Sequence, residues 1–153
     1  MSPPRTTNAM PLLRGGAVWL LIAITETLHG IARTVFLEPE VGDLRARQIG
    51  VFTGSVLILG IALLFVNWLG ARTRSALLGV GALWLLLMLA FEVGTARALG
   101  YSWQRIGSDY DPRVGGLMLL GMVVLLLAPL FAARLRGLDR PASATTLKAG
   151  PRR

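Results

Sequence analysis

Long apolar runs alternate along the chain with short segments that are rich in charge. Four runs approach the ~20 residues that an α-helix needs to cross a ~30 Å hydrocarbon core. They cover residues 15–37, 49–69, 77–99 and 115–133. The pattern predicts an all-α integral membrane protein, with a four-transmembrane-helix bundle over residues 15–137 and cytoplasmic tails over residues 1–14 and 138–153.

The first run differs from the others because Glu26, His29 and Arg33 interrupt its second half. Its basic start, at Arg5 and Arg14, is also found in secretory signal peptides. The apolar stretch is longer than that of a signal, however, and no clear small-residue cleavage site follows it. We therefore expect an uncleaved signal anchor that stays in the membrane as the first span.

Arginine and lysine are distributed unevenly over the flanks of the four runs. Ten lie in the two tails and the second loop: Arg5, Arg14, Arg72, Arg74, Arg134, Arg136, Arg140, Lys148, Arg152 and Arg153. Five lie in the other loops and at the end of the third span: Arg45, Arg47, Arg97, Arg105 and Arg113. The positive-inside rule then puts both termini in the cytoplasm of a prokaryotic inner membrane.

Aromatic residues near the ends of the spans agree with this orientation. Aromatic belts lie at both membrane interfaces, where amphipathic rings meet the headgroups. We expect an inner belt and an outer belt, made respectively of Trp19, Trp68 and Trp84 and of Tyr101, Trp103 and Tyr110.

Composition narrows the function classes. Of 153 residues, 54% are hydrophobic and 16% are charged, and the formal net charge is +8. The basic residues crowd the ends of apolar runs rather than forming a basic face, so we expect no nucleic-acid partner. With no cysteine and one histidine, His29, we expect no cofactor and no resident metal.

The tail over residues 138–153 is rich in Pro, Ala, Thr and basic residues. It has too little apolar surface to fold alone, so we expect disorder. Its positive charge would keep it near anionic lipid headgroups at the cytoplasmic face. For the membrane domain, a homo-oligomer and a larger membrane complex both remain open.

The two halves of the chain align when one is shifted by 66 residues. Matches between charged or glycine positions are informative because only 16% of the residues are charged. We interpret the offset as two tandem helical hairpins related by a two-fold axis along the membrane normal. The matched residues are Gly15 with Gly81, Glu26 with Glu92, Asp43 with Asp109, Arg47 with Arg113, Gly50 with Gly116, Phe65 with Phe131 and Arg74 with Arg140.

Ionisable residues inside the apolar runs mark the candidate site. Glu26, His29 and Arg33 follow i, i+3, i+7 spacing and share one helix face, and Glu92 lies in the third run. A charge in mid-membrane costs ~2.5–3.5 kcal/mol, so such groups normally face the bundle interior and find a partner. Arg47, after the first loop, is a candidate partner for either glutamate.

Three interpretations of this face remain open. The face is either a polar lock that holds the helices in register, or a solute or proton site open to the outside, or a Glu-x-x-His metal motif. The motif needs a second copy, and the repeat has Thr95 where His29 would be required. We expect the first or second interpretation, with Arg113 as a further basic partner of the glutamates.

The loops and the small residues complete the predicted architecture. Pro39 and Gly42 should end the first helix, while Asp43 and Asp109 could cap the second and fourth. Small residues allow close helix packing. Four glycines are predicted packing positions: Gly50, Gly54, Gly116 and Gly121.

These residues indicate a small non-enzymatic membrane protein, either a transport-like binder or an accessory subunit. The polar cluster would lie towards its periplasmic side. The alternative is a membrane-embedded enzyme or metal-binding protein that uses Glu26 and His29. No nucleotide-binding loop and no hydrolase motif occurs in the sequence.

Overall fold

The computed structural model describes residues 9–138 of the chain. Every secondary-structure element in that part is helical, so the predicted all-α fold is confirmed there. The elements are α1 (Ala9–Ala32), the π-helical turn η1 (Arg33–Leu37), α2 (Glu38–Val41), α3 (Asp43–Leu69), α4 (Arg74–Ala98), α5 (Trp103–Tyr110), the 3-10 turn η2 (Pro112–Val114) and α6 (Met118–Leu135).

Four helical stretches are long and apolar enough to cross a membrane: Ala9–Val41, Asp43–Leu69, Arg74–Ala98 and Met118–Leu135. They agree in number and order with the predicted spans. The first helix begins inside the predicted tail of residues 1–14, and α3 begins at Asp43 rather than near residue 49. Residues 1–8, and the predicted disordered tail beyond Leu138, lie outside the described residues.

The first helix passes through Pro39 instead of ending before it. Proline lacks an N–H and its ring crowds the carbonyl four residues earlier. Just before Pro39 the helix widens into the π turn η1, where the amide of Glu38 bonds to the carbonyl of Arg33. The helix ends only at Gly42, with φ of +82°. The expectation that Pro39 breaks the helix is therefore wrong, because the π turn relieves the clash.

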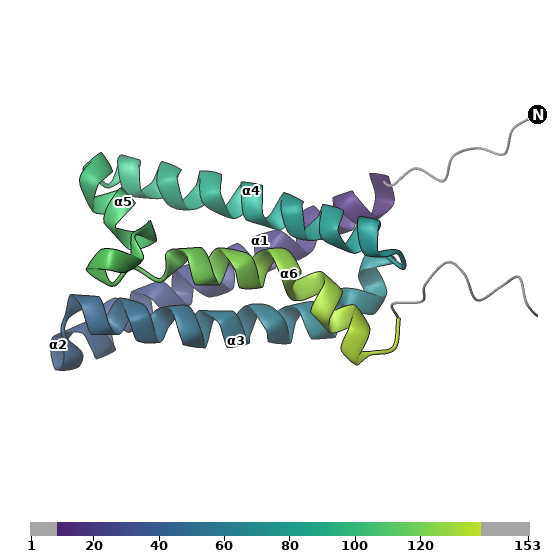
Figure 1. Ribbon diagram of the computed structural model, residues 1–153, viewed down its shortest axis with the longest axis horizontal. Helices are drawn as coiled ribbons and strands as arrows, with labels where there is room; N and C mark the ends of the chain where they lie inside the picture. Colours follow the sequence, from purple (N-terminus) through teal and green to yellow (C-terminus); the bar gives the residue numbers. More distant parts are fainter. Residues whose placement is uncertain (1–8, 139–153) are drawn as a thin grey trace, which may run out of the picture.

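Both ends of the described chain lie at one end of the molecule, and α2 and α5 lie at the other (Figure 1). We call the latter the α2–α5 end. Around the molecule, α1 contacts α3 and α4, and α6 contacts the same two helices. Helices matched by the 66-residue offset, α1 with α4 and α3 with α6, are thus neighbours, whereas a central two-fold axis would place them at opposite corners. The predicted two-fold relation between two hairpins is therefore not confirmed, and the offset stays a feature of the sequence.

The apolar core joins α1, α3, α4 and α6 at the end away from α2 and α5. Trp84 is fully buried, and its indole N–H donates to the carbonyl of Gly15 on α1 at 2.8 Å. On α4, Gly81 lies against the backbone carbonyl of Leu126 in α6. Trp84 is thus a core residue rather than a member of an aromatic belt, because its N–H finds a partner inside the protein.

Two other tryptophans are exposed at opposite ends of the molecule, each with an arginine over its ring. The guanidinium of Arg14 lies 5.4 Å from the centre of Trp68, and that of Arg97 lies 4.8 Å from the centre of Trp103. Such cation–π pairs suit side chains with one apolar and one wet surface. Their placement at membrane interfaces stays a prediction.

Candidate functional site

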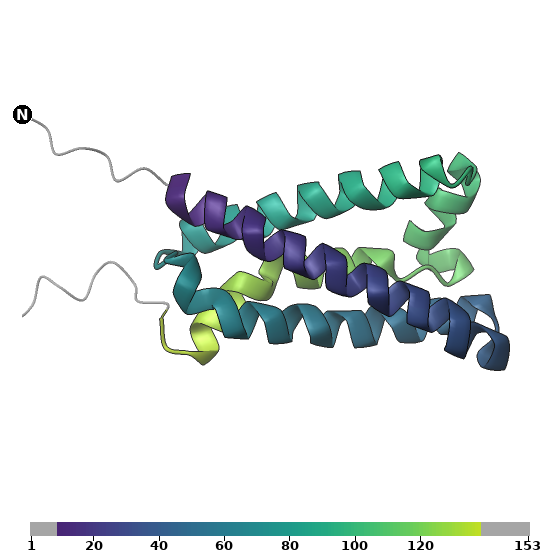
Figure 2. The same ribbon diagram turned by 180° about the vertical axis from the view of Figure 1, so that it is seen from behind.

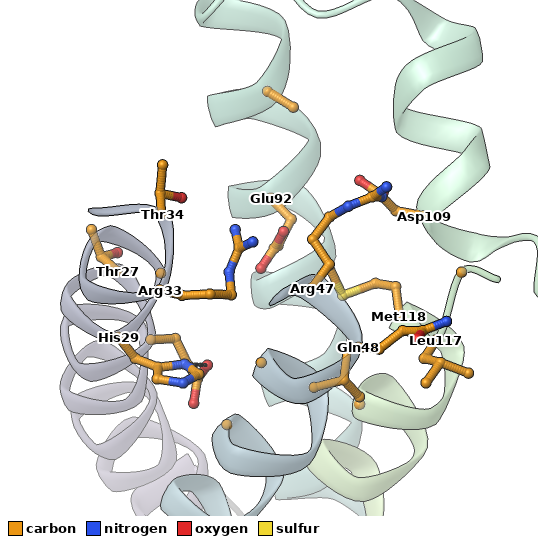
Figure 3. Close-up of a pocket in the computed structure, with 18 of the residues that line it drawn as sticks. Thr27, His29, Arg33, Thr34, Arg47, Gln48, Glu92, Asp109, Leu117 and Met118 are labelled. Atoms are coloured by element: carbon orange, nitrogen blue, oxygen red, sulfur yellow. Dashed lines mark hydrogen bonds and ion pairs between the residues drawn. The ribbon is translucent and has the colours of Figure 1, made fainter. Parts of the chain in front are cut away.

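A cavity of about 660 Å³ opens among α1, α3, α4 and α6, and residues of η1 and α5 also line it. Its volume falls within the ~300–1,000 Å³ range of ligand pockets. Five of the six polar residues predicted as a ligand or proton site line this cavity, as the close-up in Figure 3 shows in part: Glu26, His29, Arg33, Arg47 and Glu92. The sixth, Arg113, is exposed in η2 and does not line it.

His29 connects α1 to α3 at the wall of the cavity. Its Nε2 lies 2.8 Å from the hydroxyl of Thr53, and its Nδ1 lies 3.5 Å from Oε2 of Glu26. The Thr53 hydroxyl donates to the carbonyl of Ile49 at 3.0 Å. With its proton directed at Ile49, the Thr53 hydroxyl is an acceptor for His29, an arrangement that suits the tautomer protonated at Nε2.

This hydrogen bond determines what the contact between Glu26 and His29 requires. A neutral imidazole protonated at Nε2 presents a lone pair at Nδ1, which would face the lone pairs of an ionised carboxylate. The contact is favourable only if one proton lies between them, either on the imidazole or on the carboxyl group. We infer from this geometry that Glu26 and His29 form a one-proton pair in the first helix.

Two glycines of α3 make room for the charged side chains of the first helix. A Cβ atom on Gly54 would lie 2.7 Å from Oε2 of Glu26, and one on Gly50 would lie 2.6 Å from Cδ of Arg33. Gly50 and Gly54 thus lie at the contact between α1 and α3. The space that they leave is occupied by polar side chains rather than by an approaching helix backbone.

The other two predicted packing glycines lie near the start of α6. Gly116 is buried against the backbone carbonyls of Ser108 and Asp109, and leaves no room for a side chain. Gly121 is less crowded, since a Cβ there would lie 3.7 Å from Val51 of α3. Gly116 therefore fixes α5 against the start of α6, while Gly121 makes only ordinary contact.

Arg33 and Glu92 point toward each other across the cavity, the first from η1 and the second from α4 (Figure 3). Near them, three buried polar atoms of cavity-lining residues lack a hydrogen-bond partner among the described residues: Oε1 of Glu26, Nη1 of Arg33 and Nε of Arg47. A buried polar atom without a partner costs ~1–3 kcal/mol. One acceptor and two donors are therefore left for a molecule in the cavity.

Two arginines and two aspartates form a closed set of ion pairs at the cavity wall. Arg47 pairs with Asp43 at 2.9 Å and also with Asp109. Arg105 pairs with the same two carboxylates, at 3.2 Å and 3.5 Å. We call these four residues the Asp–Arg lock, because they join the first turns of α3 to α5.

The Asp–Arg lock corrects the predicted role of its aspartates. The residue before α3 is Gly42 and the residue before α6 is Leu117, and neither helix has a side-chain cap. Asp43 and Asp109 are instead held by arginines, which offer several donors in place of a backbone amide. Arg105 is absent from the predicted site residues, although its i, i+4 spacing to Asp109 was a local signal for an ion pair.

The phenol of Tyr110, at the end of α5 and outside the four apolar helices, is influenced by the carboxylates of Glu92 and Asp109. Burial raises the pKa of its phenol from 10.0 to about 12, and Glu92 and Asp109 add to the shift. Between pH 10.0 and about pH 12 the folded protein binds more protons than the unfolded chain. The free energy of unfolding should therefore fall as the pH rises through this range. Tyr110→Phe should remove that part of the fall.

Chemical unfolding in detergent at several pH values measures this effect. Tyr101→Phe removes an exposed phenol and is the matched control, which should keep the fall attributed to Tyr110. Equal pH profiles for wild type and Tyr110→Phe would show that the phenol is not protected in the folded protein.

The Glu-x-x-His spacing of Glu26 and His29 is not extended into a metal site. Within residues 9–138, no group of three or more His, Asp or Glu side chains is arranged to hold a metal ion. A di-iron bundle needs a second Glu-x-x-His copy and two further carboxylates. The metal alternative thus lacks the ligand set that it requires in the described part of the chain.

No protein-family model, curated protein or solved structure matches this chain. Function therefore has to follow from the side chains of the site, since a fold alone does not determine function. The site offers a cavity of ligand size, a one-proton pair and polar atoms of both kinds without partners.

Proposed function

We propose that the chain is a multi-pass protein of a prokaryotic inner membrane with both termini in the cytoplasm. Four spans return the chain to the side on which it began. The end of the molecule opposite the α2–α5 end also carries Arg14, Arg72 and Arg134, as the positive-inside rule requires of a cytoplasmic face. The cavity then lies towards the periplasmic side.

We further propose that the protein is a non-enzymatic binder of a ligand whose polar groups occupy the cavity. The observation that carries this proposal is the set of unpartnered atoms on Glu26, Arg33 and Arg47 at one cavity. Polar groups buried in a membrane protein are expensive unless they are paired. A ligand with both a donor and an acceptor would supply the missing partners.

The geometry also separates structural from ligand-binding roles. In the Asp–Arg lock each carboxylate has two arginine partners, so a polar lock is already present without Glu26. Within residues 9–138, Glu26 forms an ion pair with His29 at 3.5 Å, and its Oε1 has no partner. We therefore assign register to the Asp–Arg lock and ligand or proton binding to Glu26.

Native mass spectrometry of the full chain, purified from membranes in detergent, tests the proposal. Wild type should carry a bound molecule of constant mass. Glu26→Gln should melt at nearly the wild-type temperature yet lose about tenfold or more of the affinity, which corresponds to ~1.4 kcal/mol. Glu40→Gln changes an exposed carboxylate of α2 outside the cavity lining and should keep the bound molecule.

Other outcomes would contradict the proposal in different ways. Wild-type protein without any bound mass, or equal occupancy in Glu26→Gln, would remove ligand binding at this site. A large fall in melting temperature for Glu26→Gln, with unchanged occupancy, would make Glu26 a structural residue. A second protein in fixed ratio would instead favour the accessory-subunit role.

A further inference from the structure

The first helix changes partners along its length. Near its start, Gly15 contacts α4 through Trp84, and Trp19 meets Phe91 edge-on with ring centres 6.2 Å apart. Beyond Trp19, the first helix makes polar and close contacts with α3, at Gly54, Thr53 and Gly50. Seen from behind, α1 crosses from α4 towards α3 (Figure 2). The helices α1 and α4 run in the same direction and move apart towards the α2–α5 end. Residues of both α1 and α4 line the cavity where the two helices move apart.

Exposed apolar side chains line the cavity along the two diverging helices. On the first helix these are Ile31 and Val35, each 57% exposed. On the other side they are Phe91 in α4 and Leu99 just after it. Ile31, Val35 and Phe91 belong to membrane-spanning stretches, so lipid is the medium that they face. These side chains put apolar surface at the cavity between α1 and α4, where an opening would face the bilayer.

The interior of the cavity is polar and carries excess negative charge. Five carboxylates line it, at Glu26, Glu38, Asp43, Glu92 and Asp109. Three guanidinium groups oppose them, at Arg33, Arg47 and Arg105. Since Glu26 and His29 share one proton and together carry no net charge, the lining has an excess of one carboxylate, which favours a ligand with a cationic group. The unpartnered donors on Arg33 and Arg47 require an acceptor on the same ligand.

Resting on the ligand-binding function proposed above, we propose that the ligand is a zwitterionic membrane lipid that carries a phosphate and a primary ammonium. It reaches the cavity from the bilayer, between α1 and α4. The ammonium lies against the carboxylates of Glu26 and Glu92, and the phosphate accepts from Arg33 and Arg47. The acyl chains leave past Ile31 and Phe91 into the surrounding lipid, so that the ligand matches the cavity at both its polar and its apolar end.

Binding of three probes to the purified full chain in detergent tests the chemistry and the source of the ligand. The probes are dioctanoyl phosphatidylethanolamine, dioctanoyl phosphatidylglycerol, which lacks the ammonium, and glycerophosphoethanolamine, the headgroup without chains. The first should bind at least about tenfold more tightly than either of the others. Native mass spectrometry gives the occupancies across a concentration series.

Each contrary result overturns a stated part of the proposal. Equal binding of phosphatidylglycerol would overturn the headgroup assignment. Equal binding of glycerophosphoethanolamine would overturn the lipid source while leaving polar-ligand binding in place. Failure of all three probes would overturn the lipid proposal, and the bound mass on wild-type protein would then decide the proposed function separately.

A matched pair of variants tests the sideways opening. Thr95→Trp places a large ring on an exposed position of α4 that lines the cavity. Leu86→Trp places the same ring on an exposed position of α4 outside the lining. The first should weaken phosphatidylethanolamine binding by about tenfold or more, and the second should leave it unchanged. Equal affinities in two folded variants would overturn access between α1 and α4.

Discussion

Replacing Gly81 with alanine is expected to lower the free energy of unfolding by about 2 kcal/mol. A Cβ atom there would overlap the backbone carbonyl of Leu126, so α4 and α6 would have to separate. Overpacking costs ~1–3 kcal/mol, and the upper end applies here because a backbone carbonyl cannot rotate away as a side chain can. Alanine recovers up to ~1 kcal/mol of helix propensity, which is too little to offset the clash.

The same helix offers a matched control. Gly79, two residues earlier in α4, has no atom within 4 Å of its Cβ position. Gly79→Ala should therefore be neutral or slightly stabilising, by at most ~1 kcal/mol. The unfolding of both variants is measured in mixed detergent micelles as the fraction of denaturing detergent is increased. Equal stabilities of the two would mean that α4 and α6 do not touch at Gly81.

Replacing Arg47 with glutamine should destabilise the protein by about 1–2 kcal/mol and loosen the α2–α5 end. Asp43 and Asp109 would then share Arg105 as their remaining partner in the Asp–Arg lock. Breaking a fully buried ion pair costs ~3–5 kcal/mol. The Arg47 side chain is 22% exposed and that of Asp109 is 28% exposed, so solvent screening reduces the loss.

Arg45 provides the control for this prediction, since it lies two residues away and is exposed. Arg45→Gln should change the free energy of unfolding by no more than ~0.5 kcal/mol. A double-mutant cycle of Arg47→Gln with Asp109→Asn should give a coupling of at least ~0.5 kcal/mol that shrinks at high salt. A coupling near zero would show that this ion pair does not hold α5 to α3.

Both variants change contacts of the scaffold, and Arg47 in addition lines the cavity. Gly81 holds α4 to α6 near one end, and the Asp–Arg lock holds α3 to α5 near the other. Between them, the second half of α1 meets α3 at Gly54 and bears Glu26 and His29. We infer that the scaffold keeps the cavity open while Glu26 and His29 meet the ligand.

The sequence alone determined the number and order of the membrane-spanning helices. Apolar length is a local property, so it can be read without knowing any contact. The shared face of Glu26, His29 and Arg33 was predictable for the same reason, because helical spacing fixes which residues point the same way. The glycines at positions 50 and 54 were predictable as places of close approach, though not what approaches them.

The tertiary structure decided how these helices pair and which charges meet. Asp43 and Asp109 both pair with Arg47 and Arg105, and Arg105 lies 62 residues from Asp43 in the chain. The 66-residue offset predicted a two-fold arrangement, which the packing of α1 beside α4 and of α3 beside α6 does not confirm. Local spacing determines the face of a helix, whereas the partner of that face depends on the shapes and charges of all the other helices. The cavity, which lies where α1 leaves α4 for α3, therefore followed only from the packed molecule.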